Sequence, residues 1–532
     1  MATITGFQGK QWVAGTKDYD EYDYSYSYST YGDKRLHPAL IIQPNSVDDI
    51  VTAVKYAKKA NIAIAVRTGG HQYSGASSTY APNIQLDLKH TFKTDADRQM
   101  FEKDGRSLVR TSVSWSLLEF NDWLGSKSCF VPHGQCIGVH LGGHVQTGGY
   151  GQLGRSFGLL GDHVLSLEIV DHNGDVKEIT KQNAPEMFFA ILGGSPGNLG
   201  VLTHFTVEVH NDGDYGGFSK EQGGPRGLKA IHLYHPDTVK RLLKILVEMS
   251  DNPDYPRNYD LCISVLSSDF PILKWFKHSN RDAIDHHFRE DHPEIYGEDD
   301  RPLWPRTIVV FAQWVPLGPD DVCDMSWFEK LNHGALWGEV EENVMSKMTS
   351  KWLFRAEREF ELPYIKRTYF TKSNTLGKDG WVDWVTARVD EIIDPVFNNC
   401  WLSCQFQCFG GKNSKFTTNA DNGTAYSWRD SSMCATTDCF YAEEARQTAA
   451  DWQYINDHQG VGQDGIFSKQ DRRVLWGSWG DFDFDKVWSC YHEDREKYER
   501  VMEVRKKADP DGVFTPNSFC VKRADREIRT QL

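Results

Sequence analysis

Arg67-Thr-Gly-Gly-His-Gln-Tyr73 is the first of three glycine-rich stretches that decide the fold of this chain; the others are Gly142-Gly-His-Val-Gln-Thr-Gly-Gly-Tyr150 and Gly193-Gly-Ser-Pro-Gly-Asn-Leu-Gly200. Glycine lets the backbone approach a ligand closely and point its N–H groups at phosphate oxygens. None of the three stretches follows the GxGxxG dinucleotide pattern or the P-loop pattern. Three such loops together nevertheless favour one large phosphate-bearing cofactor over three independent turns.

Around these loops, the first half of the chain alternates strand and helix patterns. Ser46 is a suitable N-cap for a helix that runs through Ala60. Buried-strand patterns follow at residues 62–66, 84–88, 108–111 and 164–170. The last of them leads into the turn His172-Asn-Gly174.

The middle of the chain, from about residue 215 to residue 475, has a different pattern. Strand-like runs such as 261–266 and 307–314 occur beside a helical pattern at 236–249, which indicates an antiparallel sheet with covering helices. Residues 485–507 predict one charged amphipathic helix, and the Tyr/Asp/Ser-rich residues 18–31 predict a surface segment. The expected fold class is therefore α+β.

Composition excludes several classes of function. The 532 residues include 59 Lys and Arg and 74 Asp and Glu, so the net charge is −15, and no basic block offers a face for nucleic acid. No run of apolar residues is long enough to predict a membrane-spanning helix. Met1–Lys17 lacks the apolar core of a signal peptide, so a cytoplasmic location is expected, or a secreted one if a signal has been removed.

The cysteines favour a reducing compartment. There are 11 of them, an odd number, and they form no CxxC pair and no Cys/His spacing typical of zinc, so no metal site is expected. Cys404 and Cys408 are expected on the hydrophobic face of a strand. The sequon Asn422-Gly-Thr424 is a weak indication of the opposite compartment.

A family resemblance rests on Arg67–Tyr73 together with Gly134-Gln-Cys-Ile-Gly-Val-His-Leu-Gly-Gly-His144. These residues resemble the berberine-bridge-enzyme-like branch of the vanillyl-alcohol-oxidase flavoprotein superfamily. Residues 193–200, 424–430 and 508–514 resemble its GGGGNFG loop, its ATAFPHR-type strand and its closing YDPxxVF signature. The resemblance implies a two-part FAD-binding domain of the PCMH type, residues 1–212 and 485–532. It also implies a substrate domain, residues 213–484, with an antiparallel sheet covered by helices.

The resemblance also implies FAD bound covalently at two points. His71 would bond the flavin 8-methyl carbon and Cys136 the ring carbon C-6, and imidazole and thiolate are nucleophiles suited to an electron-poor ring. Taken alone, His71 would be an ordinary loop histidine and Cys136 a buried thiol; the motif context favours the linkage. The other residues expected around FAD are Arg67, Thr68, Gly69, Gly70, Val139, Gly142, Gly143, His144, Gly148, Gly149, Asn198, Gly200 and Val201.

Three of these positions carry further expectations from the family. His144 would hydrogen-bond the flavin and stabilise its reduced form. Val139 stands where the family controls access of oxygen, and a valine there resembles members that react with O2. Tyr73 falls where sugar oxidases of the family have a tyrosine in the site.

The proton acceptor departs from the family pattern. Trp476 stands at the tyrosine of the YxNYxD motif, and Gln407 stands where an acid precedes a Gly-Gly pair. Neither side chain titrates, so Trp476, Gln405 and Gln407 are expected to line the pocket and orient the substrate, as is Trp479. The remaining candidates for the acceptor are Tyr73, Tyr426, His133 and His140.

Together these residues predict an FAD-dependent oxidase. It would remove a hydride from a C–H carbon of a bulky small molecule, a specialised metabolite or a sugar, and reduce O2 to H2O2. The chain is expected to be a monomer or homodimer without nucleic-acid or membrane partners. Two alternatives stay open: a flavin-dependent oxidative cyclase, and a flavin-binding protein that has lost catalysis.

Overall fold

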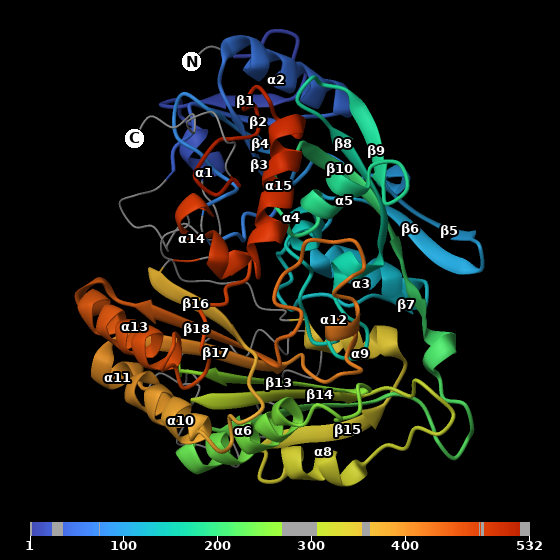
Figure 1. The fold of residues 1–532 in the computed structure, drawn as a ribbon, viewed down its shortest axis with the longest axis vertical. Coiled ribbons are helices and arrows are strands. Elements are labelled where there is room, and N and C mark those ends of the chain that lie inside the picture. Colours follow the sequence, from blue (N-terminus) through green and yellow to red (C-terminus); the bar gives the residue numbers. More distant parts are fainter. Residues whose placement is uncertain are drawn as a thin grey trace.

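A computed structural model of the chain describes residues 3–23, 36–73, 75–268, 306–353, 362–477, 479 and 484–521. It consists of two lobes, an upper one and a lower one as drawn in Figure 1. The part of the expected surface segment beyond residue 23 lies outside the described residues. No helix in the described part of the chain is both long and apolar enough to cross a membrane.

Two sheets build the upper lobe. A four-stranded sheet has the order β1-β2-β4-β3, in which β2 and β3 both run parallel to β4. A five-stranded antiparallel sheet has the order β5-β6-β10-β8-β9. Their strands are β1 Lys10–Val13, β2 Leu40–Gln43, β3 Ile64–Arg67, β4 Ile84–Asp87, β5 Arg98–Lys103, β6 Arg106–Ser112, β8 Val164–Val170, β9 Val176–Thr180 and β10 Val201–Glu208.

Local signals in the sequence fix the ends of these elements. Helix α2, Val47–Ala60, begins where the Ser46 side chain accepts a hydrogen bond from the backbone N–H of Asp49, and it ends at Asn61 in a left-handed conformation. Gly174 has a positive φ of 80° in the turn between β8 and β9, a conformation that favours glycine. Both the Ser46 cap and the turn before Gly174 confirm the sequence prediction.

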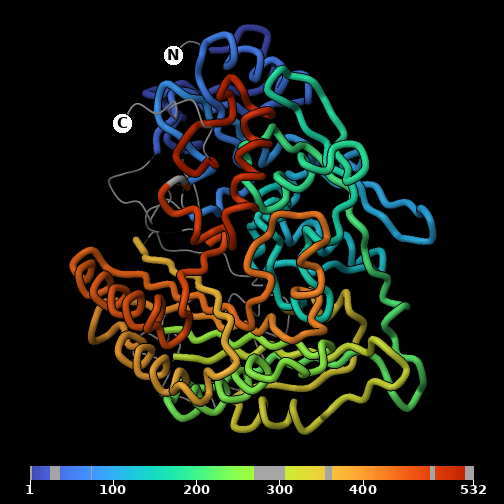
Figure 2. The backbone as a smooth tube through the Cα atoms, viewed as in Figure 1, coloured from blue at the N-terminus to red at the C-terminus, as the bar shows by residue number. Residues whose placement is uncertain are grey.

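The C-terminal helices pack on the upper lobe. The expected single helix over 485–507 is wrong: the structure has α14, Phe484–Tyr491, and α15, Arg495–Ala508. Asp494 starts the second helix by accepting a hydrogen bond from the backbone N–H of Lys497. Figure 2 shows this red segment beside the blue and cyan parts of the chain, and its apolar residues share one core with residues 4–209.

Short elements complete the upper lobe. They are the helices α1 Tyr19–Asp23, α3 Leu117–Ser126, α4 Leu141–Gln146 and α5 Pro185–Ile191, and the paired short strands β7 Cys129–Phe130 and β11 His210–Asn211. The expected boundaries at residues 212/213 and 484/485 stay predictions.

The lower lobe is a seven-stranded antiparallel sheet in the order β15-β12-β14-β13-β17-β18-β16. Its strands are β12 Arg226–Leu233, β13 Tyr259–Leu266, β14 Thr307–Trp314, β15 Trp337–Glu342, β16 Tyr364–Thr371, β17 Cys400–Cys408 and β18 Met433–Tyr441. The helices of this half of the chain are α6 Pro236–Asp251, α8 Met325–Asn332, α9 Met345–Trp352, α10 Trp381–Ile392, α11 Pro395–Asn398, α12 Lys415–Thr418 and α13 Arg446–Gly460.

The two faces of this sheet differ in polarity. Helices α6, α8, α10 and α13 cover one face, as Figure 1 shows, and this face holds Cys404 and Cys408 in an apolar core, as predicted. Because side chains alternate along a strand, Gln405 and Gln407 project to the other face, toward the upper lobe.

Arg155 joins the two lobes. Its fully buried guanidinium donates hydrogen bonds to the backbone carbonyls of Tyr255, Pro256 and Gly410, each at 2.9 Å, and to that of Tyr259. The backbone N–H of Arg155 donates to the Asp260 carboxylate at 3.0 Å. A single side chain of the upper lobe therefore hydrogen-bonds several backbone carbonyls of the lower lobe, before and at the start of β13 and after β17.

Replacing Arg155 with methionine will leave those buried carbonyls without donors. We expect the free energy of unfolding, measured by urea denaturation, to fall by about 3 to 5 kcal/mol. Arg446→Met is the matched control, since Arg446 pairs with Glu443 on the surface and its loss should cost about 0.5 kcal/mol. Equal losses for the two variants would contradict the role of Arg155.

Candidate functional site

A cavity of about 910 Å³ lies where the upper lobe meets the polar face of the lower sheet. Loops of the upper lobe supply most of its wall, and β13, β16, β17 and β18 supply the opposite wall. The structure brings most of the predicted residues together here: Arg67, Thr68, Gly69, Gly70, His71, Tyr73, Cys136, Val139, Gly142, Gly143, His144, Asn198, Gln405, Gln407 and Trp476.

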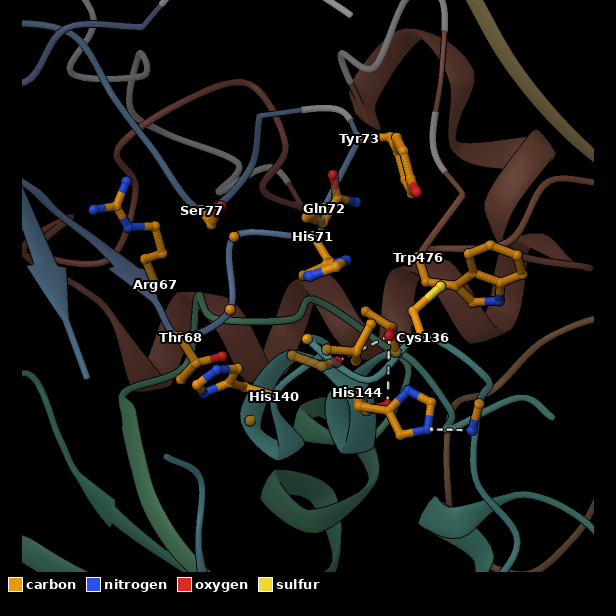
Figure 3. A pocket seen from close by; sticks show the side chains of 18 of the residues that line it. Arg67, Thr68, His71, Gln72, Tyr73, Ser77, Cys136, His140, His144 and Trp476 are labelled. Carbon is orange, nitrogen blue, oxygen red and sulfur yellow. Dashed lines mark hydrogen bonds between the residues drawn. The ribbon is translucent and has the colours of Figure 1, made fainter. Parts of the chain in front are cut away.

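The loops that carry His71 and Cys136 interlock. A Cβ atom added to Gly138 would lie 3.2 Å from His71 Nε2, and one added to Gly69 would lie 2.8 Å from the carbonyl oxygen of Gly138. Glycine at both positions therefore lets the loop after β3 rest on the loop before α4. Figure 3 shows His71 above Cys136 in the cavity, with Trp476 beside the thiol.

Cys136 is the one exposed cysteine in the described part of the chain. Its sulfur opens into the cavity, yet the surrounding protein displaces water from it, and this desolvation raises the pKa of the Cys136 thiol. The positive charge of Lys366 acts in the opposite sense and favours the thiolate, and Asp438 reinforces the rise.

His140 and His144 are uncharged at neutral pH. Desolvation lowers the pKa of His144 to about 3 and that of His140 to about 3 as well. His144 Nε2 accepts a hydrogen bond from the backbone N–H of Gly134 at 3.0 Å, drawn as a dashed line in Figure 3. His144 is thereby held as a neutral ring beneath the Cys136 loop.

The opposite wall is polar and contains one ion pair. Gln405 donates to the side chain of Gln135 across the cavity. Lys366 Nζ lies 2.9 and 2.7 Å from the two carboxylate oxygens of Asp438, which faces it directly on the neighbouring strand. Lys366 and Asp438 were not predicted from the sequence. They become neighbours in the cavity wall only because β16 pairs with β18, and this strand order is not visible in the sequence.

Several predicted residues lie outside the cavity wall. The Tyr426 ring is buried and its hydroxyl donates to the carbonyl oxygen of Val145 at 2.5 Å, so the structure does not present it to a substrate. Arg67, unlike these residues, does line the cavity, and its guanidinium forms an ion pair with Asp87 at 2.7 Å. The guanidinium carbons of Arg367 and Arg473 lie 4.0 and 3.8 Å from the centre of the Trp479 ring. The others that do not line the cavity are Gly148, Gly149, Gly200, Val201 and His133.

The residues present fit a flavin dinucleotide. A Cβ atom added to Gly143 or Gly197, both in the cavity wall, would meet no atom within 4 Å, so open space lies against the backbone there. Trp476 Nε1 and His140 Nδ1 are buried polar atoms without a hydrogen-bond partner among the described residues, and both residues line the cavity. His71 and Cys136 would hold such a cofactor from the side of the two interlocked loops.

The low pKa of His144 predicts how stability depends on pH. Between about pH 6.5 and pH 3 the unfolded chain binds a proton at this residue that the folded chain does not, so the fold loses stability as pH falls through this range. We expect this residue to contribute a slope of about 1.4 kcal/mol per pH unit below 6.5. His144→Gln, which keeps an acceptor for Gly134, should lose that contribution in urea denaturation at pH 7, 6 and 5. Identical slopes in both proteins would show that His144 is not held neutral.

Parts of the chain are similar in sequence to known proteins. Residues 38–180 match a family model described as an FAD binding domain. Berberine bridge enzyme-like 18 of Arabidopsis thaliana is 29% identical over 347 residues, which are 63% of this chain and 57% of that protein. The chain covers less than two thirds of the length of the curated relatives it matches.

Solved structures show the same fold over nearly the whole chain. Wild-type BBE-like 1 of Physcomitrella patens superposes with a TM-score of 0.70 at 16% identity and covers 98% of each chain. A chitooligosaccharide oxidase superposes with a TM-score of 0.69 at 16% identity and the same coverage. The expected α+β fold is confirmed. Residues 38–180 are therefore similar in sequence to an FAD-binding domain, and the chain as a whole shares the fold of the berberine-bridge-enzyme-like structure.

Proposed function

We propose that the chain is an FAD-dependent oxidase that holds its flavin by two covalent bonds, through His71 and Cys136. The observation that carries this proposal is the pair of interlocked loops, which brings an imidazole and an exposed thiol to one cavity beside a polar wall. FAD would supply the chemistry of hydride acceptance and of electron transfer to O2. The protein would bind the substrate, orient it and accept its proton.

The polar wall supports a neutral substrate that carries hydroxyl groups. Ser264, Ser403, Gln405, Gln407 and Thr436 offer uncharged hydrogen-bonding groups, and the one charged pair on this wall is neutral as a unit. Aromatic side chains complete the surface on which a ring could stack; they are Tyr73, Tyr364 and Trp476. A sugar or a polycyclic metabolite alcohol would suit this lining.

Tyr73 is the proton acceptor that we favour among the four predicted candidates. Tyr426 and His133 do not line the cavity, and His140 packs with the glycine loops, where Gly69 lies against its ring. Tyr73 lines the cavity opposite the sheet wall, and the Lys366 ammonium lies 4.3 Å from the centre of its ring. The Tyr73 hydroxyl is a titratable group of the kind that a general base needs.

Val139 supports O2 as the electron acceptor. It lies between Cys136 and His140, is half-buried and lines the cavity, so a small aliphatic side chain borders the space where the flavin ring would lie. Release of H2O2 distinguishes an oxidase from a flavin-binding protein without catalysis, and analysis of the organic product distinguishes it from an oxidative cyclase.

Denaturation of the purified holoprotein tests the two covalent bonds. We expect the flavin to remain on the wild-type chain after acid precipitation, and to remain on both single variants, His71→Ala and Cys136→Ala, because one bond suffices to retain it. The double variant should release all of its flavin. The measurement is the visible absorption of the pellet and the intact mass of the polypeptide.

Cys490→Ala is the matched control for loss of a cysteine outside the cavity wall. Release of flavin from the wild-type chain would contradict both attachments, and release from one single variant would identify the substituted residue as the single attachment point. A peroxide-coupled screen of sugars and aromatic alcohols then tests the oxidase. A holoprotein that releases no H2O2 with any of them would favour the inactive flavin-binding protein.

A further inference from the structure

The thiol of Cys136 must ionise before it can act as a nucleophile. The thiolate, not the thiol, attacks carbon. Desolvation in the cavity raises the pKa of this thiol, so its environment opposes ionisation. A positive charge close by would favour the thiolate and with it a bond from the Cys136 sulfur.

Lys366 supplies a positive charge at this place. In the described part of the chain, Lys366 and Asp438 are the charged side chains that act on the thiol; Lys366 has the larger effect and favours the thiolate. Lys366 Nζ lies 5.6 Å from the centre of the Trp476 ring, and Figure 3 shows Cys136 beside that ring. The loop that faces the thiol adds the titratable groups His71 and Tyr73.

The Lys366 ammonium is held in place. It donates to both carboxylate oxygens of Asp438 from the directly opposed position on the neighbouring strand, and the two side chains are 5% and 14% exposed. The faces of the Tyr73 and Trp476 rings also attract a cation. Because the pair is shielded from water, salt screens its field less than that of a surface lysine.

The neighbouring histidines cannot replace this charge. Burial lowers the pKa of His133, His140 and His144, those of the last two to about 3, so their rings are neutral when the thiol would ionise. In the proposed function His71 is itself committed to the flavin 8-methyl carbon. Among the described residues, the fixed ammonium on β16 is thus the remaining source of positive charge for the thiol.

We propose that Lys366, fixed by Asp438, promotes ionisation of Cys136 and so drives formation of the sulfur–flavin bond. This inference rests on the proposed function, in which Cys136 bonds the flavin carbon C-6. The thiol proton leaves to water, and the sulfur electron pair forms the S–C bond. The hydrogen on C-6 then leaves as a proton, and two electrons pass to O2, which becomes H2O2 with two protons. Lys366 is a positioning residue in this step: it acts through Cys136.

The experiment follows linkage at Cys136 during incubation of the purified protein with FAD in air. Samples are denatured, free thiols are alkylated with iodoacetamide, and the peptide that contains Cys136 is scored by mass for flavin or for the alkyl group. We expect Lys366→Met to slow linkage at about pH 7 by about tenfold for each unit by which the thiol pKa rises. Lys366→Arg, which keeps the charge, should retain the linkage.

The pH dependence separates this role from a structural one. Hydroxide ionises the thiol without help, so linkage in Lys366→Met should recover by about tenfold per unit as the pH rises from about 7 to about 9. A variant that merely disturbs the fold would show no such recovery. Flavin retained through His71 in the same samples reports that the cavity is still formed.

Two further variants keep the test decisive. Lys366→Met with Asp438→Asn removes the buried carboxylate that the single substitution leaves unpaired, and it should link more slowly than the wild type because Lys366 has the larger effect on the thiol. Arg226→Met with Glu342→Gln removes a directly opposed pair at the far edge of the same sheet and should link normally.

The outcomes distinguish this inference from the proposed function. Normal linkage in Lys366→Met at about pH 7, beside a linked wild type, would overturn the role of Lys366 alone. An unlinked Cys136 in the wild type would overturn the two-bond attachment and this inference with it.

Discussion

Burial of the Arg155 guanidinium between the lobes is the interaction on which the site depends. A charged group without exposure to water is stable only if its hydrogen bonds are satisfied, and here carbonyls of the lower lobe satisfy them. Arg155 thus holds the polar face of the seven-stranded sheet against the upper lobe. The buried pair Asp162–Arg429, at 2.7 Å, joins the upper lobe to the segment between β17 and β18.

Because Arg155 holds the two lobes together, each lobe contributes a wall of different chemistry to the cavity. The upper lobe contributes glycine-rich loops, neutral histidines and the two candidate attachment residues, His71 and Cys136. The lower sheet contributes amides, hydroxyls and the pair Lys366–Asp438. A cofactor held by the loops would therefore meet its substrate on the sheet side, and the same lysine would serve both the Tyr73 ring and the Cys136 thiol.

Much of this arrangement could be predicted from the sequence because it depends on local signals. The Ser46 cap, the turn before Gly174 and the glycine loops each follow from neighbouring residues. The helix break at Asp494 was missed because the charged pattern continues across it. Tyr426 was placed in the site from its motif, but the path of the chain turns its ring into the core, where it donates to Val145. Lys366 and Asp438 depend on strand order, which no local pattern determines.

Attachment of one flavin to two separate loops is the claim from which the rest of the proposed chemistry follows. Protease digestion of the denatured holoprotein, followed by mass mapping of every flavin-bearing peptide, tests it. A single cross-linked species, in which one flavin joins the peptide containing His71 to the peptide containing Cys136, is the predicted result. Flavin on one of these peptides alone, on neither, or on a different peptide would contradict it.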